Sequence, residues 1–186
     1  RLGMLRQTHL SESMTEIENC LKEHGRTPVQ YLHDIGFLDS GTILAHCVQM
    51  QGDDLDIIRS CGSTIVTNPA SNAKLGNGIA PVVSMQEKGI NLCIGTDGTA
   101  SNNTLNLFRE MGLLSLIQKA ANRDSTALSS ASILGAATEN AAKALQMEGQ
   151  LGVIAEGAKA DLIFLDLHAV SLFPNNNILS SLCSSA

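Results

Sequence analysis

The chain has 186 residues, of which 44% are hydrophobic and 16% charged, and its 18 acidic residues outnumber its 12 basic ones. These values predict a globular fold with a sizeable core and argue against a disordered chain. The net charge of −6, without a cluster of Lys and Arg, argues against a nucleic acid or an anionic membrane as partner and favours a small-molecule ligand.

The cysteines point to a reducing compartment. Cys20, Cys47, Cys61, Cys93 and Cys183 are odd in number and form no C-x-x-C pair, which is typical of free thiols in the cytosol. The sequence has no uninterrupted apolar run of about 18 residues and no signal-peptide pattern at its start. We therefore expect a soluble, cytoplasmic protein.

Short apolar runs alternate with longer helical patterns along most of the chain. Strands are expected at 2–9, 42–47, 63–69 and 91–98, and a helical stretch follows each of them. This alternation is typical of βα units around a parallel sheet, so the fold class is α/β.

Helix signals follow the first strand and recur in two later segments. Ser11 or Ser13 can cap the first helix, Glu16 stands three residues after Ser13 as in a capping box, and Gly25 can end the helix. An amphipathic helix is expected over 103–120, and one further helix over 129–147. The apolar face of the helix over 103–120 would carry Leu105, Phe108, Leu113, Leu116 and Ile117.

The residue pattern of the sequence changes after Gly149. Gly152 and Gly157 are expected in turns, and apolar runs at 153–154 and 162–165 predict a small antiparallel β unit. The chain therefore divides into a βα region over 1–148 and a β-rich region over 149–186.

The ends of the predicted strands carry the candidate functional residues. Catalytic groups of a parallel βα barrel lie at the carboxyl ends of its strands, and here those ends carry His9, His46 and Asp97, with Glu12 three residues after His9. Asp97 ends a buried strand without a local Lys or Arg, so a cation is the favoured partner for its carboxylate. His and Asp are suitable ligands for zinc or a similar divalent ion.

Each of these residues also has a purely structural interpretation. An Asp in a Thr-Asp-Gly turn commonly bonds its own backbone, and Glu12 can be a first-turn acid favoured by the helix dipole. A single His at a strand end is commonly a core or surface residue, and only the coincidence of all three strand ends favours the metal site. The remaining histidines, His24, His33 and His168, are expected to be structural or solvent-facing.

Five segments together resemble the amidohydrolase superfamily, and within it the methylthioadenosine/S-adenosylhomocysteine deaminases. They are HLSE (9–12), LAHCV (44–48), TNPASNAKLGNGIAPV (67–82), GTDGTASNNTLNLFREM (95–111) and GQLGVIAEGAKADLIFLD (149–166). The resemblance implies a metal-dependent aminohydrolase. It also implies that 1–148 is the second half of a TIM-type (β/α)8 barrel, and that 149–186 is the returning, truncated part of a small β-sandwich domain.

The resemblance also implies roles for the strand-end residues. His9 and Asp97 would be metal ligands, and Asp97 would also take a proton from the attacking water. Glu12 would hold and protonate a ring nitrogen of the purine, and His46 would lie beside the water and the leaving amino group, so that Glu12 and His46 both contact substrate. The metal would be zinc or another divalent ion such as iron or manganese. Loop residues Ser71, Asn72, Ser101 and Asn102 would lie near the pocket, without assigned contacts.

The sequence departs from the family pattern in one respect. It has no His-x-His, the pair that family members carry on their first barrel strand, and a barrel needs about 250 residues. We therefore expect a fragment that binds zinc weakly, deaminates poorly or not at all, and forms a homo-oligomer through unpaired sheet edges. A chlorohydrolase of the same superfamily and a noncatalytic assembly module remain as alternatives.

Overall fold

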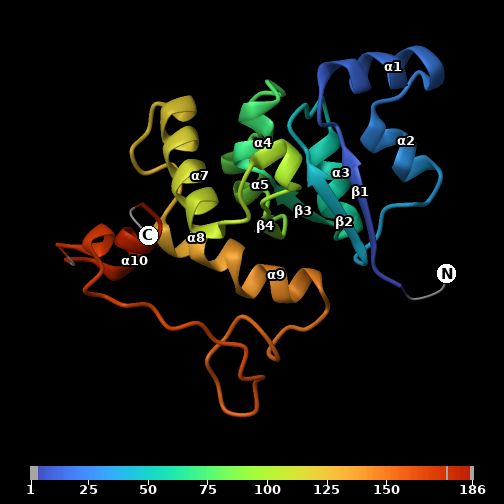
Figure 1. The fold of residues 1–186 in the computed structure, drawn as a ribbon. Coiled ribbons are helices and arrows are strands. Elements are labelled where there is room, and N and C mark those ends of the chain that lie inside the picture. Colours follow the sequence, from blue (N-terminus) through green and yellow to red (C-terminus); the bar gives the residue numbers. More distant parts are fainter. Residues whose placement is uncertain (1–3, 175, 185–186) are drawn as a thin grey trace.

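The computed structural model describes residues 4–174 and 176–184, and one parallel sheet lies at its centre (Figure 1). The sheet consists of β1 (Arg6–Leu10), β2 (Thr42–His46), β3 (Thr64–Thr67) and β4 (Leu92–Ile94), in the spatial order β1-β2-β3-β4. All four predicted strands are present, although they are shorter than expected. Residues 2 and 3 of the first predicted strand lie outside the described residues.

Helices connect the strands and cover the sheet. They are α1 (Met14–His24), α2 (Pro28–Asp34), α3 (Asp54–Cys61), α4 (Pro69–Lys74), α5 (Val82–Glu87), α6 (Thr99–Asn102), α7 (Leu107–Asn122), α8 (Ser130–Ala137), α9 (Glu139–Ala144) and α10 (Ile178–Leu182), with a 3-10 turn η1 (Val170–Leu172). In Figure 1, α1 to α3 lie beside β1 and β2, whereas α7 to α9 lie toward β4. Within the described part of the chain, no helix has the length and apolar character needed to cross a membrane.

Among the described residues, the short helices α2, α4, α6 and α10 were not expected from the sequence, and one predicted helix is divided. Helices α2, α4 and α6 occupy segments that were read as connections. The helix expected over 129–147 is interrupted at Thr138, whose φ of −130° and ψ of −89° are not helical. The result is the pair α8 and α9, both of which contact β4.

The turn from β1 into α1 is fixed by two acceptors. The Ser13 hydroxyl accepts a hydrogen bond from the Glu16 amide over 3.3 Å, and Gly25 ends the helix with a left-handed φ of 64°, as predicted. The Glu16 carboxylate does not close a capping box on Ser13. It accepts instead from the amides of Ser11 and Glu12, at 2.8 Å each, and so it holds the segment that carries Glu12.

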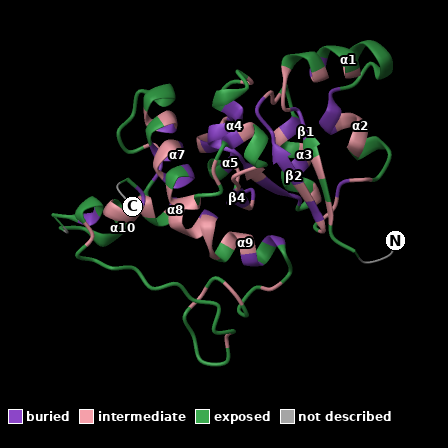
Figure 2. Ribbon diagram, viewed as in Figure 1, coloured by how far each residue is buried: buried purple, intermediate pink, exposed green. Residues whose placement is uncertain are grey.

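The core lies between the sheet and its helices. Leu44, Ile65, Ile58, Val82 and Met85 have no exposed surface, and Figure 2 shows the buried residues concentrated on the inner strands. Truncation of such a side chain to Ala typically costs about 2–5 kcal/mol. The first strand differs, because β1 alternates between exposed and partly buried residues and forms an open edge of the sheet.

The strands expected at 153–154 and 162–165 are absent from the described structure, so this prediction is wrong. The segment contains turns and bends but no helix or strand, and Ile154 and Phe164 are 93% and 94% exposed. Figure 2 shows it almost wholly exposed. A strand needs a neighbour for its backbone hydrogen bonds, and no described segment supplies one here. The assignment of 149–186 to a separate domain stays a prediction.

Candidate active site

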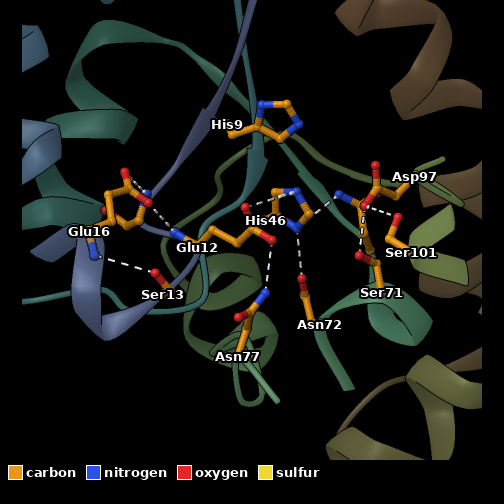
Figure 3. Close-up of polar contacts among 12 residues, drawn as sticks. His9, Glu12, Ser13, Glu16, His46, Ser71, Asn72, Asn77, Asp97 and Ser101 are labelled. Carbon is orange, nitrogen blue, oxygen red and sulfur yellow. Dashed lines mark hydrogen bonds and ion pairs between the residues drawn. The ribbon is translucent and has the colours of Figure 1, made fainter. Parts of the chain in front are cut away.

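The parallel sheet brings the predicted residues to one edge. His9 pairs with Ala45 and Leu10 with His46, so the carboxyl ends of β1 and β2 lie level with each other. One ligand atom from each of His9, His46 and Asp97 lies within 4.8 Å of the other two. The two imidazole rings, labelled in Figure 3, stack with their centroids 5.3 Å apart. The convergence expected from the strand ends is therefore present.

The backbone leaves the strands in an unusual conformation at this edge. His46, Cys47 and Asp97 have φ values of 74°, 48° and 58°. These values lie in the left-handed region, which residues other than glycine rarely adopt. Such residues cost about 1–3 kcal/mol each and persist where the surrounding structure holds them. Here the amide of Cys47 donates to the carbonyl of Leu10 over 3.0 Å, which ties the bend after β2 to the end of β1.

A glycine makes room for this arrangement at the end of β4. A Cβ on Gly95 would lie 2.5 Å from Oδ1 of Asn68 and 2.8 Å from Cγ1 of Val66. Asn68 is itself buried beside His46, so a side chain at position 95 would displace a neighbour of the site. The motif Gly-Thr-Asp-Gly therefore begins with glycine because the ends of β3 and β4 approach closely.

Two serine hydroxyls hold the carboxylate of Asp97. Ser71 and Ser101 both donate to Oδ2 of Asp97, at 2.6 and 2.7 Å, from α4 and α6 respectively (Figure 3). Partial burial raises the pKa of Asp97. The hydrogen bonds from both serines and the Gly98 amide, with attraction from His46, outweigh that effect and hold the pKa below its usual value. Asp97 is therefore ionised at neutral pH.

The ring of His46 is oriented by a buried amide. Oδ1 of Asn72 lies 2.8 Å from Nδ1 of His46, and both side chains are almost fully buried. Nδ2 of Asn68, a donor, lies farther from the same nitrogen, at 3.4 Å, so the shorter contact with an oxygen that only accepts assigns the proton to Nδ1. In the neutral ring, Nε2 then has the free lone pair, and it lies 3.8 Å from Oε2 of Glu12. The tautomer that leaves Nε2 as an acceptor on the Glu12 side is thus selected.

Glu12 is fixed by a residue far away in the sequence. Nδ2 of Asn77 donates to Oε1 of Glu12 over 2.8 Å, which leaves Oε2 on the side of His46. The carboxylate therefore has one oxygen held by the protein and one directed toward the other candidate residues (Figure 3).

The other histidines lie outside this cluster, as expected. His24 stacks on Tyr31 with ring centroids 4.1 Å apart, His33 lies 3.7 Å from Asp34, and His168 has a 93% exposed side chain. None of them shares the site.

Sequence reasoning missed the residues that hold the candidate residues in place. Ser71, Asn72 and Ser101 were placed in loops near the pocket, but their contacts were not assigned. Asn77 was not singled out, because a polar residue between two glycines carries no signal beyond a turn.

The donor set fits a divalent cation. Two imidazoles and a carboxylate are ligands that zinc, iron and manganese accept, and their ligand atoms are close enough to share one ion. The lowered pKa of Asp97 agrees with this fit, because a ligating carboxylate must be deprotonated.

Comparison with known proteins identifies the family of the chain. Residues 1–184 match the model of the Amidohydrolase family. The chain is 42% identical over 185 residues to a 5-methylthioadenosine/S-adenosylhomocysteine deaminase of Caldanaerobacter subterraneus subsp. tengcongensis, covering 100% of this chain and 43% of that protein. It is 44% identical over 178 residues to the protein of the same name from Pyrococcus abyssi, covering 96% of this chain and 41% of that protein.

Solved structures show the same relationship. An adenosine deaminase from Xanthomonas campestris with bound zinc superposes with a TM-score of 0.95 at 34% identity, over 98% of this chain and 42% of that one. An atrazine chlorohydrolase from Arthrobacter aurescens complexed with zinc gives a TM-score of 0.90 at 27% identity, over 97% and 40%. The chain thus spans less than half the length of these relatives, and its sheet is part of their barrel. Its fold, its site residues and the match along nearly its whole length establish that the chain belongs to the amidohydrolase family.

Proposed function

We propose that the chain is part of a metal-dependent deaminase that hydrolyses methylthioadenosine, S-adenosylhomocysteine or a related aminated heterocycle. The convergence of His9, His46 and Asp97 beside Glu12 carries this proposal. The name shared by relatives 42–44% identical to the chain supports the substrate class. The strands that would complete a barrel of about 250 residues are proposed to lie outside residues 1–186.

His9 and Asp97 are proposed to hold the metal ion, with His46 beside it. Zinc is the proposed ion because two similar solved structures contain it. A divalent ion lowers the pKa of a water toward about 7, which makes hydroxide available at neutral pH.

Asp97 is proposed to deprotonate the attacking water, and His46 is proposed to orient it. Asp97 is ionised at neutral pH because its pKa lies below the usual value, so it can take a proton from the water. Nε2 of His46, whose other nitrogen is engaged by Asn72, can accept a hydrogen bond from the same water and orient it toward the carbon that bears the amino group.

Glu12 is proposed to bind and protonate a ring nitrogen of the substrate. With Oε1 held by Asn77, its other oxygen is available to bond the ring nitrogen next to the carbon under attack. A proton delivered there prevents negative charge from building up on that nitrogen as water adds. A proton on the amino group then allows ammonia to leave, so that one water is consumed and one ammonia is released.

Hydrolytic removal of chloride is the second candidate. The structural similarity to an atrazine chlorohydrolase favours it, because the same attack by water on a ring carbon displaces either leaving group. The deaminase is preferred because sequence identity to the named deaminases is much higher, 42% against 27%.

The test is a comparison of leaving groups in a protein that contains this chain within a whole barrel. Ammonia release from methylthioadenosine and S-adenosylhomocysteine, and chloride release from a chlorotriazine, are measured side by side. Glu12→Gln and Asp97→Asn should each lower ammonia release by about 10²- to 10⁴-fold. His168→Gln, at an exposed position outside the site, should leave it unchanged. Chloride release without ammonia release would favour the chlorohydrolase. If the protein released neither chloride nor ammonia, both candidates would be contradicted.

A further inference from the structure

A fully buried carboxylate lies behind the candidate site and has no place in the proposed chemistry. Glu110, on α7, has no exposed surface. Its Oε2 accepts from the amide of Ala70 over 2.9 Å, and its Oε1 accepts from Nδ2 of Asn102 over 2.8 Å. Burial of a carboxylate is unfavourable unless both oxygens find donors, so these two bonds account for its retention in the core.

The two donors belong to the two segments that hold the site. Ala70 directly precedes Ser71 and Asn72, which bond Asp97 and His46. Asn102 directly follows Ser101, the second serine on Asp97, and its Nδ2 also donates to the carbonyl of Thr96 over 2.6 Å.

We infer that Glu110 is a positioning residue, which sets the spacing between Asp97 and His46 by fastening α4 and the loop from Thr96 to Asn102 to the same carboxylate. The inference rests on the proposed function for its meaning, because the spacing matters only where those two residues act on the same water.

The chemistry of the site requires a carboxylate at this position. Both partners are N–H donors, and each carboxylate oxygen serves one of them. The amide of Asn102 cannot reverse to compensate, because its Oδ1 already accepts from Nη1 of Arg109 over 3.2 Å. In Glu110→Gln the side chain keeps its size, but its NH₂ group faces another N–H donor. One of the two attachments is therefore lost without a cavity being made.

The chain offers a matched control in Asp54. This carboxylate is also fully buried, and it accepts from the amide of Gln51 over 2.9 Å and the hydroxyl of Thr27 over 2.6 Å. Its contacts join the start of α2 to α3 and include none of the candidate site residues. Asp54→Asn therefore makes the same chemical change at a comparable depth, away from the loops that hold Asp97 and His46.

The experiment compares the 186-residue chain with Glu110→Gln and Asp54→Asn. Nuclear magnetic resonance of the metal-free proteins reports the carboxyl carbon of Asp97 and the ring nitrogens of His46, and competition titration reports the affinity for Zn²⁺. We expect Glu110→Gln to shift both sets of signals and to weaken Zn²⁺ binding about 10- to 100-fold, the usual effect of losing a residue that orients metal ligands. Asp54→Asn should leave the signals in place and the affinity within about twofold, even at an equal loss of thermal stability.

Unshifted signals in Glu110→Gln, or equal changes in both variants, would overturn the inference. If a protein that contains this chain within a whole barrel binds no Zn²⁺, the metal site of the proposed function fails, while the metal-free signals still decide the role of Glu110. Should Glu110→Gln not fold, Asn102→Ala removes the attachment on the Asp97 side, together with the bonds of Asn102 to Thr96 and Arg109, and leaves the attachment to Ala70 in place. In that variant the Asp97 signal should move and the His46 signals should stay, and the opposite pattern would contradict the inference.

Discussion

The buried amide oxygen of Asn72 lies 2.8 Å from Nδ1 of His46 and selects the tautomer of that ring. The two residues are 26 positions apart, on α4 and at the end of β2, so the contact depends on how α4 is seated against the sheet. We expect Asn72→Leu to leave the imidazole proton free to move to Nε2, which would then face the water as a donor. In the whole barrel, kcat for ammonia release should fall about 10- to 100-fold with little change in KM.

Two further variants make this prediction specific. Asn72→Asp keeps an acceptor for Nδ1 and should retain more activity than Asn72→Leu. Gln118→Leu removes another buried amide, one that donates to the carbonyl of Ala80, and should leave kcat unchanged. Nitrogen chemical shifts of His46 report the tautomer directly. A kcat for Asn72→Leu equal to that of Gln118→Leu would show that Asn72 only supports the fold.

The hydrogen bonds to Asp97 make stability depend on pH in the acid range. Its pKa in the folded state lies below the unfolded value of about 3.9, so its ionised form stabilises the fold. That contribution is fully present above the unfolded pKa and is lost as the pH falls through the folded pKa. Replacing Ser71 and Ser101 together with Ala removes the two hydroxyl donors and should raise the folded pKa.

Urea unfolding between pH 2 and 7 measures this effect. The stability difference between the parent and the Ser71→Ala/Ser101→Ala variant should be constant above about pH 5 and should shrink below about pH 4. Ser60→Ala, which removes a hydroxyl on the exposed surface of α3, should show no such change with pH. A difference that is equal at pH 3 and pH 7 would mean that the serines do not act through the charge of Asp97.

The sequence predicted the meeting of His9, His46 and Asp97 because it follows from topology alone. Parallel strands place their carboxyl ends at one edge, and the last residues of each apolar run can be read directly. The contacts that hold these residues could not be read in this way. Asn77 reaches Glu12 across 65 positions, and Glu110 reaches Ala70 across 40, so both depend on the placement of loops and short helices.

Two predictions made from apolar residues alone were wrong, because tertiary contacts decided the outcome. The apolar face expected for α7 included Leu116, which is 68% exposed, whereas Glu110 on the same helix is fully buried. Apolar periodicity assumes that burial follows hydrophobicity, and a carboxylate with two N–H donors breaks that rule. The apolar run at 162–165 forms a strand only where a second strand pairs with it.

The five thiols should differ widely in reactivity, because the thiolate is the reactive form. Burial raises the pKa of Cys93 to about 12 and raises that of Cys47 further. Burial also raises the pKa of Cys183 and of Cys20, and the carboxylates of Glu16 and Glu23 add to the effect at Cys20. Cys61 is only partly buried.

We expect a thiol reagent at pH 8 to modify Cys61 first and the buried Cys47 and Cys93 only on unfolding. Peptide mass spectrometry over a time course identifies the modified position, and Cys61→Ser should abolish the fast phase. Rapid labelling of Cys47 in the folded chain would contradict the packing around the end of β2.

The exposed apolar segment at the carboxyl end should make the 186-residue chain self-associate. Ile163 and Phe164 are 73% and 94% exposed and lie outside any helix or strand, and among the described residues no strand pairs with this segment. Unpaired extended backbone with apolar side chains is a template for pairing with a second chain. The open edge strand β1, in which Gln7 and His9 are exposed, provides a further surface of the same kind.

Analytical ultracentrifugation over a range of concentrations tests which of these surfaces drives the association. Phe164→Lys should shift the chain toward monomer, because a charge on the exposed apolar run opposes its burial against a second copy. Leu116→Lys places the same charge on an exposed leucine of α7 and should have little effect, because that helix already satisfies its backbone hydrogen bonds. If both variants associate like the parent, the contact lies on another surface, and a variant at the β1 edge is the next to test. A parent chain that stays a compact monomer at every concentration would refute the expectation of a homo-oligomer.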